Sequence, residues 1–386
     1  MDFGLDEDQE LLRQSARAFL EGEYGMAVVR RLMEEDEAHA PELWARLAEL
    51  GWLGLILPES VGGVGLDFVD LAIVLEEMGR VVMPGPFFST AVCAASVLLD
   101  APDSEAAGSA LPAIAAGKCR ATIACLEAAG RLEADGIEAT WRKAPEGIVL
   151  DGVKVFVPDA LGADLILVAA RAEGSHGEAG IDLFVVPAGA TGLTLVPLRT
   201  MDQTRKQAEV RLEHVVVDVT ARLGDEGSGW PRLQRLADRA RVALCAESCG
   251  VATRVLEMSV EYAKVREQFG KPIGSFQAIQ HKCANMMVKV ESGRSAVWYA
   301  AWALANEAED APLAAAMAKA YCSEAFREVA AEGIQIHGGI GFTWEHDMHI
   351  YFKRAKSSEV SFGDSVWNRE RVAQTILPPV GGGDSK

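Results

Sequence analysis

The chain has 386 residues, enough for two or three domains, and its 49% hydrophobic content is typical of a globular protein. Its formal net charge is −19, and such an acidic balance disfavours nucleic acid and anionic membranes as partners. The N-terminus is acidic where a signal peptide would be basic, and no run of about 20 apolar residues predicts a membrane span. Seven scattered cysteines without a CxxC pair favour a reducing compartment, so we expect a cytoplasmic protein.

Residues 1–115 predict a helical N-terminal domain. Apolar residues recur at helical spacing in "EDQELLRQSARAFLEGEYG" and again in "DFVDLAIVLEEMGRVV". The glycine-rich segment "PESVGGVGLD" between them predicts a loop.

Residues 116–225 predict a β middle domain. Its segments, such as "GIVLDGVKVFVPDA" and "DLFVVPAGATGLTLVPL", are short, rich in valine and bounded by Gly, Pro and Asp. No long helical pattern separates them, so we expect an antiparallel barrel or sandwich and no dinucleotide-binding sheet of the Rossmann type.

Residues 226–377 predict a C-terminal bundle of the four-helix type, which makes the whole chain an α+β multidomain protein. The segment 231–269 reads as one helix of roughly 37 residues, with Pro231 in its first turn. Two further long helices are predicted within 276–308 and 312–337. The tail, residues 378–386, is expected to be disordered.

Polar groups gather where the first long helix ends, in "REQFGKPIGSFQAIQH". Arg266, Gln268 and Gln277 surround a predicted turn that also carries an exposed aromatic, Phe269. This group could be an anion site with an aromatic lid, or a helix C-terminus whose arginine complements the helix dipole.

A second glycine-rich point is "QIHGGIGFTWEH", which follows a helix and not a strand, so it is not a dinucleotide fingerprint. Gly338, Gly339 and Gly341 would let the backbone approach a bound group closely, or would simply end the helix. His346 and His349 form an HxxH pair, which we interpret as surface histidines of an amphipathic helix and not as metal ligands. No zinc spacing is present, so no metal site is predicted.

Glu247 is the only charged residue in "VALCAESCGVA". Its helical neighbours Ala243, Leu244, Gly250 and Val251 are apolar or small, which would desolvate the carboxylate and leave room for a ligand. The alternative is a carboxylate paired with an arginine from another helix, and the residue pattern favours neither interpretation over the other. Cys245 and Cys249, one helical turn apart, are expected to serve packing.

Together these stretches resemble the acyl-CoA dehydrogenase family over nearly the whole chain. The segment "GWLGLILPESVGGVGLDFVDLAIVLEEMGR" is similar to the family's N-terminal pattern, and "REQFGKPIGSFQAIQH" and "QIHGGIGFTWEHDMHIYFKRA" resemble its two C-terminal signatures. The resemblance implies FAD as cofactor and an oxidoreductase that introduces an α,β double bond into acyl-CoA thioesters. In this family a carboxylate takes the α-proton while the flavin takes the β-hydride.

The resemblance also implies roles for individual residues. Arg266 and Phe269 would meet the pyrophosphate and adenine side of a neighbouring subunit's FAD, because FAD lies between subunits in this family. Asp238 and Arg241 match positions beside the substrate thioester and the CoA chain. The remaining cofactor contacts implied are Gln277, Gln335, Gly338 and Gly339.

Neither of the two positions where the family carries its catalytic base holds a carboxylate here. Phe362 occupies the place near the C-terminus, and Ala240 the place on the long helix. Glu247 follows Ala240 by two helical turns, and some members that act on steroid or bulky acyl groups resemble this arrangement. We therefore predict Glu247 as base, with Asp364 as runner-up, although Asp364 or Ser365 is equally expected to cap the next helix.

The family's flavin-ring contacts are also changed. Leu126 and Pro158 replace two threonines, and Phe156 replaces a tryptophan. The resemblance thus favours FAD-dependent dehydrogenation of a bulky, branched or steroid-type acyl-CoA, with an electron-transfer flavoprotein as electron acceptor. The alternative is a non-catalytic subunit that completes the FAD site of a paralogous chain. The assembly would then be a heterotetramer and not a homotetramer. A flavin oxidase or monooxygenase on the same fold is a third reading.

Overall fold

The computed structural model describes residues 4–377, and the predicted tail at 378–386 lies outside the described residues. Contacts between Cα atoms divide the chain into two compact units. The first, here called the helical unit, comprises residues 4–16, 72–82 and 241–377. The second, called the β-containing unit, comprises residues 17–71 and 83–240.

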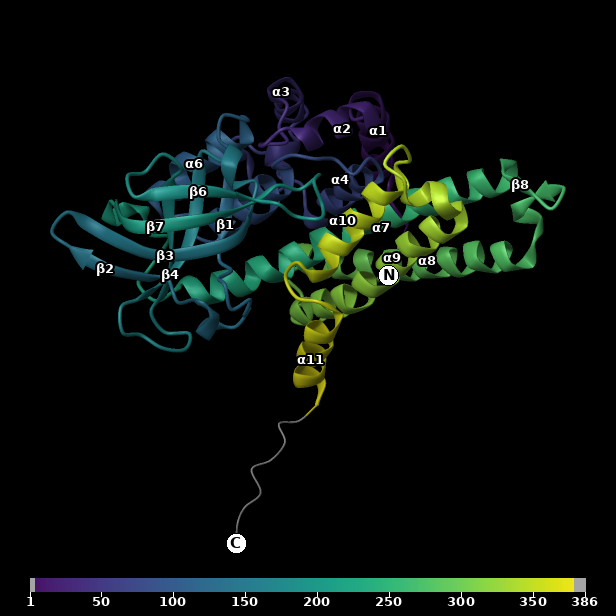
Figure 1. Cartoon of the computed structure of the whole chain (residues 1–386). Coiled ribbons are helices and arrows are strands. Elements are labelled where there is room, and N and C mark those ends of the chain that lie inside the picture. Colours follow the sequence, from purple (N-terminus) through teal and green to yellow (C-terminus); the bar gives the residue numbers. More distant parts are fainter. Residues whose placement is uncertain (1–3, 378–386) are drawn as a thin grey trace, which may run out of the picture. The chain divides into compact units, whose positions relative to one another are not determined.

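The helices predicted in the N-terminal part are present and precede the sheet (Figure 1). The loop predicted at the glycine-rich segment separates two of them, and the later part of this region includes a π-helix at Phe88–Ala94. The α-helices described before the sheet are α1 (Glu7–Glu23), α2 (Met26–Glu34), α3 (Pro41–Glu49), α4 (Phe68–Arg80), α5 (Ala95–Leu99) and α6 (Glu105–Ala115).

The middle region forms a curled, seven-stranded sheet with the order β1-β4-β2-β3-β7-β6 and with β5 paired to β4. The predicted β domain is confirmed, but the sheet is mixed, because β1 and β2 each run parallel to β4. Valine-rich composition indicates strands but carries no information on their direction. The strands are β1 (Ala121–Ala124), β2 (Thr140–Ala144), β3 (Gly147–Pro158), β4 (Leu165–Ala172), β5 (Ile181–Pro187), β6 (Leu193–Leu198) and β7 (Gln207–Val217).

The long C-terminal helices lie close to their predicted places. The helix α7 spans Gly229–Val265, which is 37 residues, with Pro231 in its first turn. A short hairpin of β8 (Glu267–Gln268) and β9 (Lys271–Pro272) leads into the next helix. The helices that follow are α8 (Gln277–Ala305), α9 (Ala311–His337), α10 (Met348–Val360) and α11 (Ser365–Ile376).

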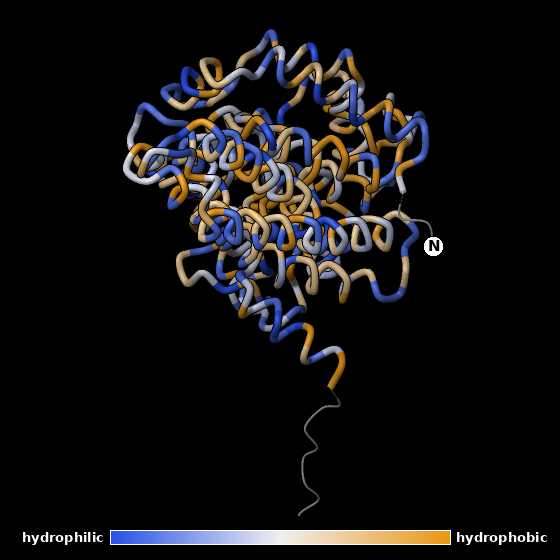
Figure 2. Tube along the Cα trace, turned by 90° about the vertical axis from the view of Figure 1, so that its right-hand side faces the viewer, coloured by the Kyte–Doolittle hydropathy of each residue, from blue (hydrophilic) through white to orange (hydrophobic). Residues whose placement is uncertain are grey.

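Hydrophobic and hydrophilic residues alternate along the trace of the chain (Figure 2). The helix α9 is at the centre of the helical unit, because α8, α10 and α11 all contact it. Its buried side includes many alanines, which let the neighbouring helices approach closely. Across residues 4–377, none of the helices combines the length and the apolar character that crossing a membrane requires.

Candidate functional site

The first group of predicted site residues lies at the end of α7, on the β8–β9 hairpin and at the start of α8. Phe269 and Gly270 form the two-residue turn of the hairpin with φ of 56° and 76°, the left-handed conformation that two-residue hairpin turns require. The turn holds the Phe269 ring 93% exposed. Its only described ring contact is an edge-on one with Phe276, with ring centroids 6.1 Å apart.

Arg266 directly precedes this hairpin and Gln277 begins α8 a few residues after it, and both are exposed. The Arg266 side chain makes no hydrogen bond or ion pair within residues 4–377, whereas its backbone closes the last turn of α7 and holds the hairpin, through Ile273 N at 2.8 Å. An exposed guanidinium beside an exposed aromatic ring is suited to a phosphate-bearing aromatic ligand. The structure thus brings Arg266, Phe269 and Gln277 into one group.

The second group lies where α9 ends. Gln335 is exposed, and Gly338 ends the helix with φ of 65°. A Cβ added at Gly338 or at Gly339 would meet no atom within 4 Å, so both glycines leave the backbone open to an approaching group. At Gly341 the glycine is required by close packing, because a Cβ there would lie 2.8 Å from His337 Cβ.

Aromatic rings pack against one another next to this glycine-rich segment. Tyr262 stacks on His337 with centroids 4.4 Å apart, and His337 meets His346 at 4.6 Å. Burial lowers the pKa of His337, whose Nδ1 lies 2.7 Å from Gly333 O. The prediction that His349 lies on the surface is wrong: it is buried and stacks on Trp344 at 4.8 Å, because the chain turns sharply before α10.

Glu247 lies inside the helical unit and forms an ion pair with Arg354 of α10. The small residues around Glu247 suggested room for a ligand, but α4 fills that space instead. A Cβ on Gly79 of α4 would lie 1.8 Å from Glu247 O, and a Cβ on Gly250 would lie 1.8 Å from Glu76 O. The backbones of α4 and α7 therefore touch beside Glu247, and its carboxylate points to an arginine, which is the alternative that the residue pattern left open.

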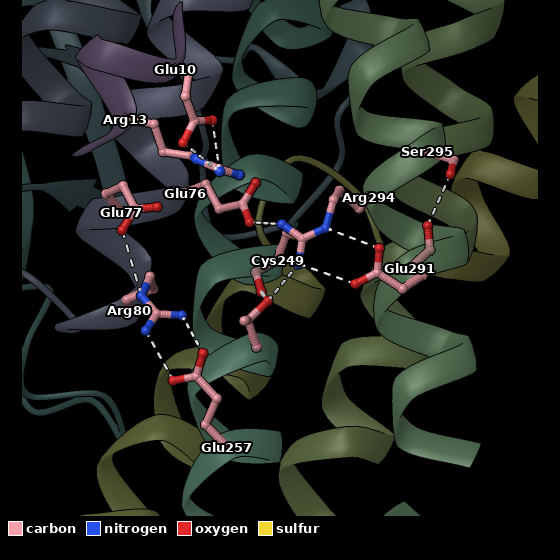
Figure 3. A network of polar contacts seen from close by, with 11 residues as sticks. Glu10, Arg13, Glu76, Glu77, Arg80, Cys249, Glu257, Glu291, Arg294 and Ser295 are labelled. Atoms are coloured by element: carbon pink, nitrogen blue, oxygen red, sulfur yellow. Dashed lines mark hydrogen bonds and ion pairs between the residues drawn. The ribbon is translucent and has the colours of Figure 1, made fainter. Parts of the chain in front are cut away.

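Further ion pairs surround this crossing of α4 and α7 (Figure 3). Arg80 of α4 holds Glu257 of α7 in a two-pronged pair, with N–O distances of 2.8 and 2.9 Å. Arg294 of α8 contacts Glu76 of α4 and Glu291 of its own helix. These pairs tie α4, α7 and α8 together, as expected of a structural network.

The turn between α10 and α11 holds Phe362 where the family resemblance places a base. Phe362 and Gly363 have φ of 56° and 96°, and Phe362 O accepts a hydrogen bond from Arg241 Nε at 3.0 Å. The Asp364 carboxylate caps α11 by accepting from Trp367 N at 2.8 Å, which confirms the predicted cap. Arg241 is almost completely buried, and Asp238, one turn earlier on α7, is buried as well.

In the β-containing unit, Phe156 lies at an irregularity of β3, where the register with β7 shifts between Lys154 and Val157. Its φ is 54° and its side chain is 53% exposed. The neighbouring Lys154 is fully buried and pairs with Glu127, which also accepts from Glu138 N at 3.0 Å. Burial lowers the pKa of Lys154, and Glu127 opposes that shift.

Leu126 and Pro158 lie beside this irregularity without a hydroxyl group to offer. The Leu126 carbonyl accepts from Val155 N at 2.9 Å, and the Pro158 carbonyl accepts from Thr122 Oγ1 at 2.5 Å. Both carbonyls therefore already accept hydrogen bonds within the fold.

The buried charges that sequence reasoning missed include Arg354, Lys319 and Lys154. Lys319 is the only charged residue in "PLAAAMAKAYC", the same signal that singled out Glu247, so it could have been found. Lys154 alternates with valines in a strand pattern and gives the same hint. Arg354 stands between Lys353 and Lys356 in sequence, and nothing there distinguishes a buried charge from exposed ones.

Comparisons with known proteins agree over most of the chain. Residues 6–118 match the model of the acyl-CoA dehydrogenase N-terminal domain, and residues 227–377 match that of the C-terminal domain. Acyl-CoA dehydrogenase IpdE2 of Mycolicibacterium smegmatis is 35% identical over 93% of this chain and 96% of its own length.

Two solved structures carry the comparison further. A steroid ACAD named Tcur3481–Tcur3483 superposes with a TM-score of 0.85 at 31% identity, covering 96% of this chain and 98% of that one. PigA with FAD and proline superposes with a TM-score of 0.88 at 25% identity, covering 97% and 99%. The chain belongs to the acyl-CoA dehydrogenase family, the oxidoreductases that dehydrogenate acyl-CoA thioesters with FAD.

Proposed function

We propose that this chain acts in the FAD-dependent α,β-dehydrogenation of a bulky, branched or steroid-type acyl-CoA, as part of a tetramer in which subunits share FAD sites. The observation that carries the proposal is the exposure of every predicted cofactor residue of the helical unit: Arg266, Phe269, Gln277, Gln335, Gly338 and Gly339. Residues that complete a neighbouring subunit's site must stay exposed in the single chain. The likeness to a steroid ACAD supports a bulky acyl group.

The adenine and pyrophosphate side of FAD fits these residues. The Arg266 side chain makes no hydrogen bond or ion pair within residues 4–377 and would pair with a phosphate oxygen. Gly338 and Gly339 offer backbone without a side chain in the way. Phe269 would cover the adenine, because its ring is exposed and its backbone is held by the hairpin.

The residues at the positions of the family's flavin-ring contacts fit FAD less well. Leu126 and Pro158 bring no hydroxyl group at the places where the family has threonines, and Phe156 stands where it has a tryptophan. FAD, when bound, supplies the hydride acceptor of the reaction. This disagreement favours an assembly in which another chain holds the flavin ring and this chain covers the adenine.

The proton step needs a carboxylate, and we propose Glu247 for it. The ion pair with Arg354 holds this carboxylate in a fixed place, and a positioned carboxylate can act as a general base. Among the described acidic residues of the helical unit that follow Ala240, Glu247 is the one that is buried. The same ion pair would also suit a purely structural residue, so activity must be separated from folding.

A second candidate function is favoured by the turn at Phe362. There the residue in the base position is a phenylalanine, and Arg241, expected beside the thioester, donates to its carbonyl. Such a chain would be the subunit that lends the adenine side to a catalytically complete paralogue. In either role, an electron-transfer flavoprotein would take the electrons.

One set of purifications tests both candidates. The chain is expressed alone and together with a motif-complete acyl-CoA dehydrogenase paralogue from the same organism, and flavin content and acyl-CoA-dependent dye reduction are measured for wild type and Glu247→Gln. Loss of dye reduction with unchanged flavin content and circular dichroism supports Glu247 as the base. A colourless chain whose Glu247→Gln variant stays fully active in the mixed assembly supports the second function. Absence of flavin from every preparation would contradict both.

A further inference from the structure

Two of the seven cysteines are in contact inside the helical unit. Cys245 lies on α7 and Cys322 on α9, and both side chains are almost completely buried free thiols. The two thiols share a hydrogen bond, and the Cys322 sulfur lies 3.6 Å from the Gly293 carbonyl oxygen of α8. The packing of the helices thus brings together two sulfur atoms from distant parts of the sequence.

The helix surfaces around this pair allow the close approach that a disulfide needs. A disulfide holds its Cβ atoms about 3.5–4.5 Å apart. Ala318 and Ala325, one helical turn to either side of Cys322, are both buried, and such small residues let helices pack closely. Cys249 is not an equivalent partner for Cys245, because side chains four residues apart on one helix have Cβ atoms about 5–6 Å apart. Cys322 is therefore the thiol suited to bond with Cys245.

A buried ammonium group lies beside the two thiols. The Lys319 side chain of α9 is 1% exposed. Its ammonium group donates to Ser323 Oγ at 2.9 Å, to Ser358 O at 2.6 Å and to Glu359 O at 3.0 Å. These three bonds use all three of its N–H groups, so its charge acts on the thiols through space. A positive charge beside a thiol favours the reactive thiolate form.

A small cavity adjoins the pair. It has a volume of about 10 Å³ and is lined by residues of α7, α9 and α10, among them Cys245, Cys322, Lys319 and Glu359. A cavity of this volume has room for about one water molecule. Ser248 also lines it and is 7% exposed, so the cavity lies just beneath the surface of the described chain. A reactant close in size to water, such as hydrogen peroxide, fits this approach, whereas glutathione disulfide is far too large.

The surrounding charges make one thiol more acidic than the other. Burial raises the pKa of Cys322, and its hydrogen bond with Cys245 raises it further. Burial also opposes the ionisation of Cys245, but the hydrogen bond with Cys322 and the charges of Lys319 and Arg241 outweigh burial and lower its pKa. Cys249 differs, because burial raises the pKa of its thiol and the charge of Glu291 adds to the rise. Cys245 is therefore the thiol of this group that ionises first.

We propose that Cys245 and Cys322 are a redox-active pair, which hydrogen peroxide converts to a disulfide between α7 and α9. The Cys245 thiolate attacks one peroxide oxygen, the O–O bond breaks, and the leaving hydroxide takes up the proton that Cys245 released. The Cys322 sulfur then attacks the sulfenic acid sulfur, and the second oxygen leaves as water with the Cys322 proton. Both sulfur atoms are oxidised and both peroxide oxygens are reduced to water. The reaction needs neither acyl-CoA nor flavin.

The experiment maps the thiols of the purified full chain before and after treatment with hydrogen peroxide. The protein is unfolded, alkylated with a maleimide and digested with trypsin, and the peptides 242–254 and 320–327 are followed by mass spectrometry. The two peptides should become linked through Cys245 and Cys322, and dithiothreitol should restore both thiols. Glutathione disulfide should leave the pair reduced. Peroxide treatment that leaves both thiols open to alkylation, or that oxidises them irreversibly without a link, would overturn the inference.

Three variants test the parts of the proposed site, with circular dichroism as the check on folding. Cys249→Ala removes the other thiol of peptide 242–254 and should form the link as wild type does. Lys319→Met should slow the reaction at pH 7 about tenfold or more and raise its pH midpoint, because Cys245 loses a charge that favours its thiolate. Lys289→Met is the matched control, a lysine of α8 that is 36% exposed, and it should react like wild type. Equal rates and midpoints in Lys319→Met and wild type would refute the role given to Lys319.

Discussion

Glu247 of α7 and Arg354 of α10 form an ion pair in which the two side chains are only 5% and 1% exposed. Both charges are almost completely buried, so the attraction between them offsets part of their desolvation cost. The pair fastens α10 to α7 next to the place where α4 crosses α7 with its backbone in contact. The carboxylate proposed as a base is therefore also a link between α7 and α10, and its variants must be judged by stability as well as by activity.

Removing one partner of this pair should cost more than removing both. We expect Arg354→Met or Glu247→Leu alone to lower the free energy of unfolding by about 3–5 kcal/mol, because a buried charge loses its counter-charge. The double variant should cost clearly less than the sum of the two. Urea unfolding followed by circular dichroism measures all three. The exposed pair Arg369–Glu324 is the control, and Arg369→Met should cost no more than about 1 kcal/mol; additive losses at the buried pair would refute the coupling.

Gly250 should not tolerate an added methyl group. Its Cβ would lie 1.8 Å from a backbone oxygen of α4, so Gly250→Ala must push two helices apart, at a cost of about 1–3 kcal/mol or more. At Gly108, in α6, an added methyl group would meet nothing within 4 Å, and Gly108→Ala should stabilise by about 0.5–1 kcal/mol through helix propensity. Thermal unfolding of the two variants compares them. Equal shifts in the two midpoints would contradict the close crossing.

Lys319 should make stability depend on alkaline pH. Burial lowers its pKa from 10.5 to about 8, with Cys245, Arg241, Cys322 and Glu359 facing the ammonium group. Between these two values the unfolded chain binds more protons than the folded one, so folding stability contributed by this group rises with pH. Over the whole window the gain is on the order of 3 kcal/mol.

The measurement compares wild type with Lys319→Met by urea unfolding between pH 7.5 and 9.5. The wild type should gain stability relative to the variant as pH rises, because only the wild type relieves a buried charge. Groups that do not face Lys319 titrate equally in both proteins and cancel in the difference. The thiols of Cys245 and Cys322 feel the charge of Lys319, so both proteins carry alanine at these two positions. A difference that stays flat, or falls, across this range would show that Lys319 does not titrate there.

Arg266 should matter for the cofactor and not for the fold. Arg266→Ala removes a charge-assisted contact to phosphate, so FAD should be held about 10- to 100-fold more weakly by the assembly, while Arg266→Lys keeps part of the affinity. Fluorescence of released flavin measures this, and circular dichroism should not change. Arg31→Ala removes an arginine that is 54% exposed and serves as control. Equal flavin retention in all three variants would remove Arg266 from the cofactor site.

Much of the fold could be predicted from the sequence because it rests on local patterns. The period of apolar residues located α7, α8 and α9 within a few residues, and the capping chemistry of Asp364 was recognisable before α11 was seen. The exposure of Phe269 also followed from the turn that carries it. The parallel pairing of β1 and β2 with β4 was missed, because it depends on connections between distant segments and not on the strands themselves.

The features of the candidate site likewise differ in whether the sequence could predict them. The sequence by itself determined which segments carry the cofactor motifs, where the expected base is replaced by Phe362, and that Glu247 is a lone charge on an apolar helix face. Only the tertiary structure decided that Arg354 lies against Glu247, that α4 fills the space beside it, and that Arg241 donates to the carbonyl of Phe362. The physical reason is that a buried charge is compensated by whichever residue the packing of helices brings near, and Arg354 lies 107 residues from Glu247 along the chain.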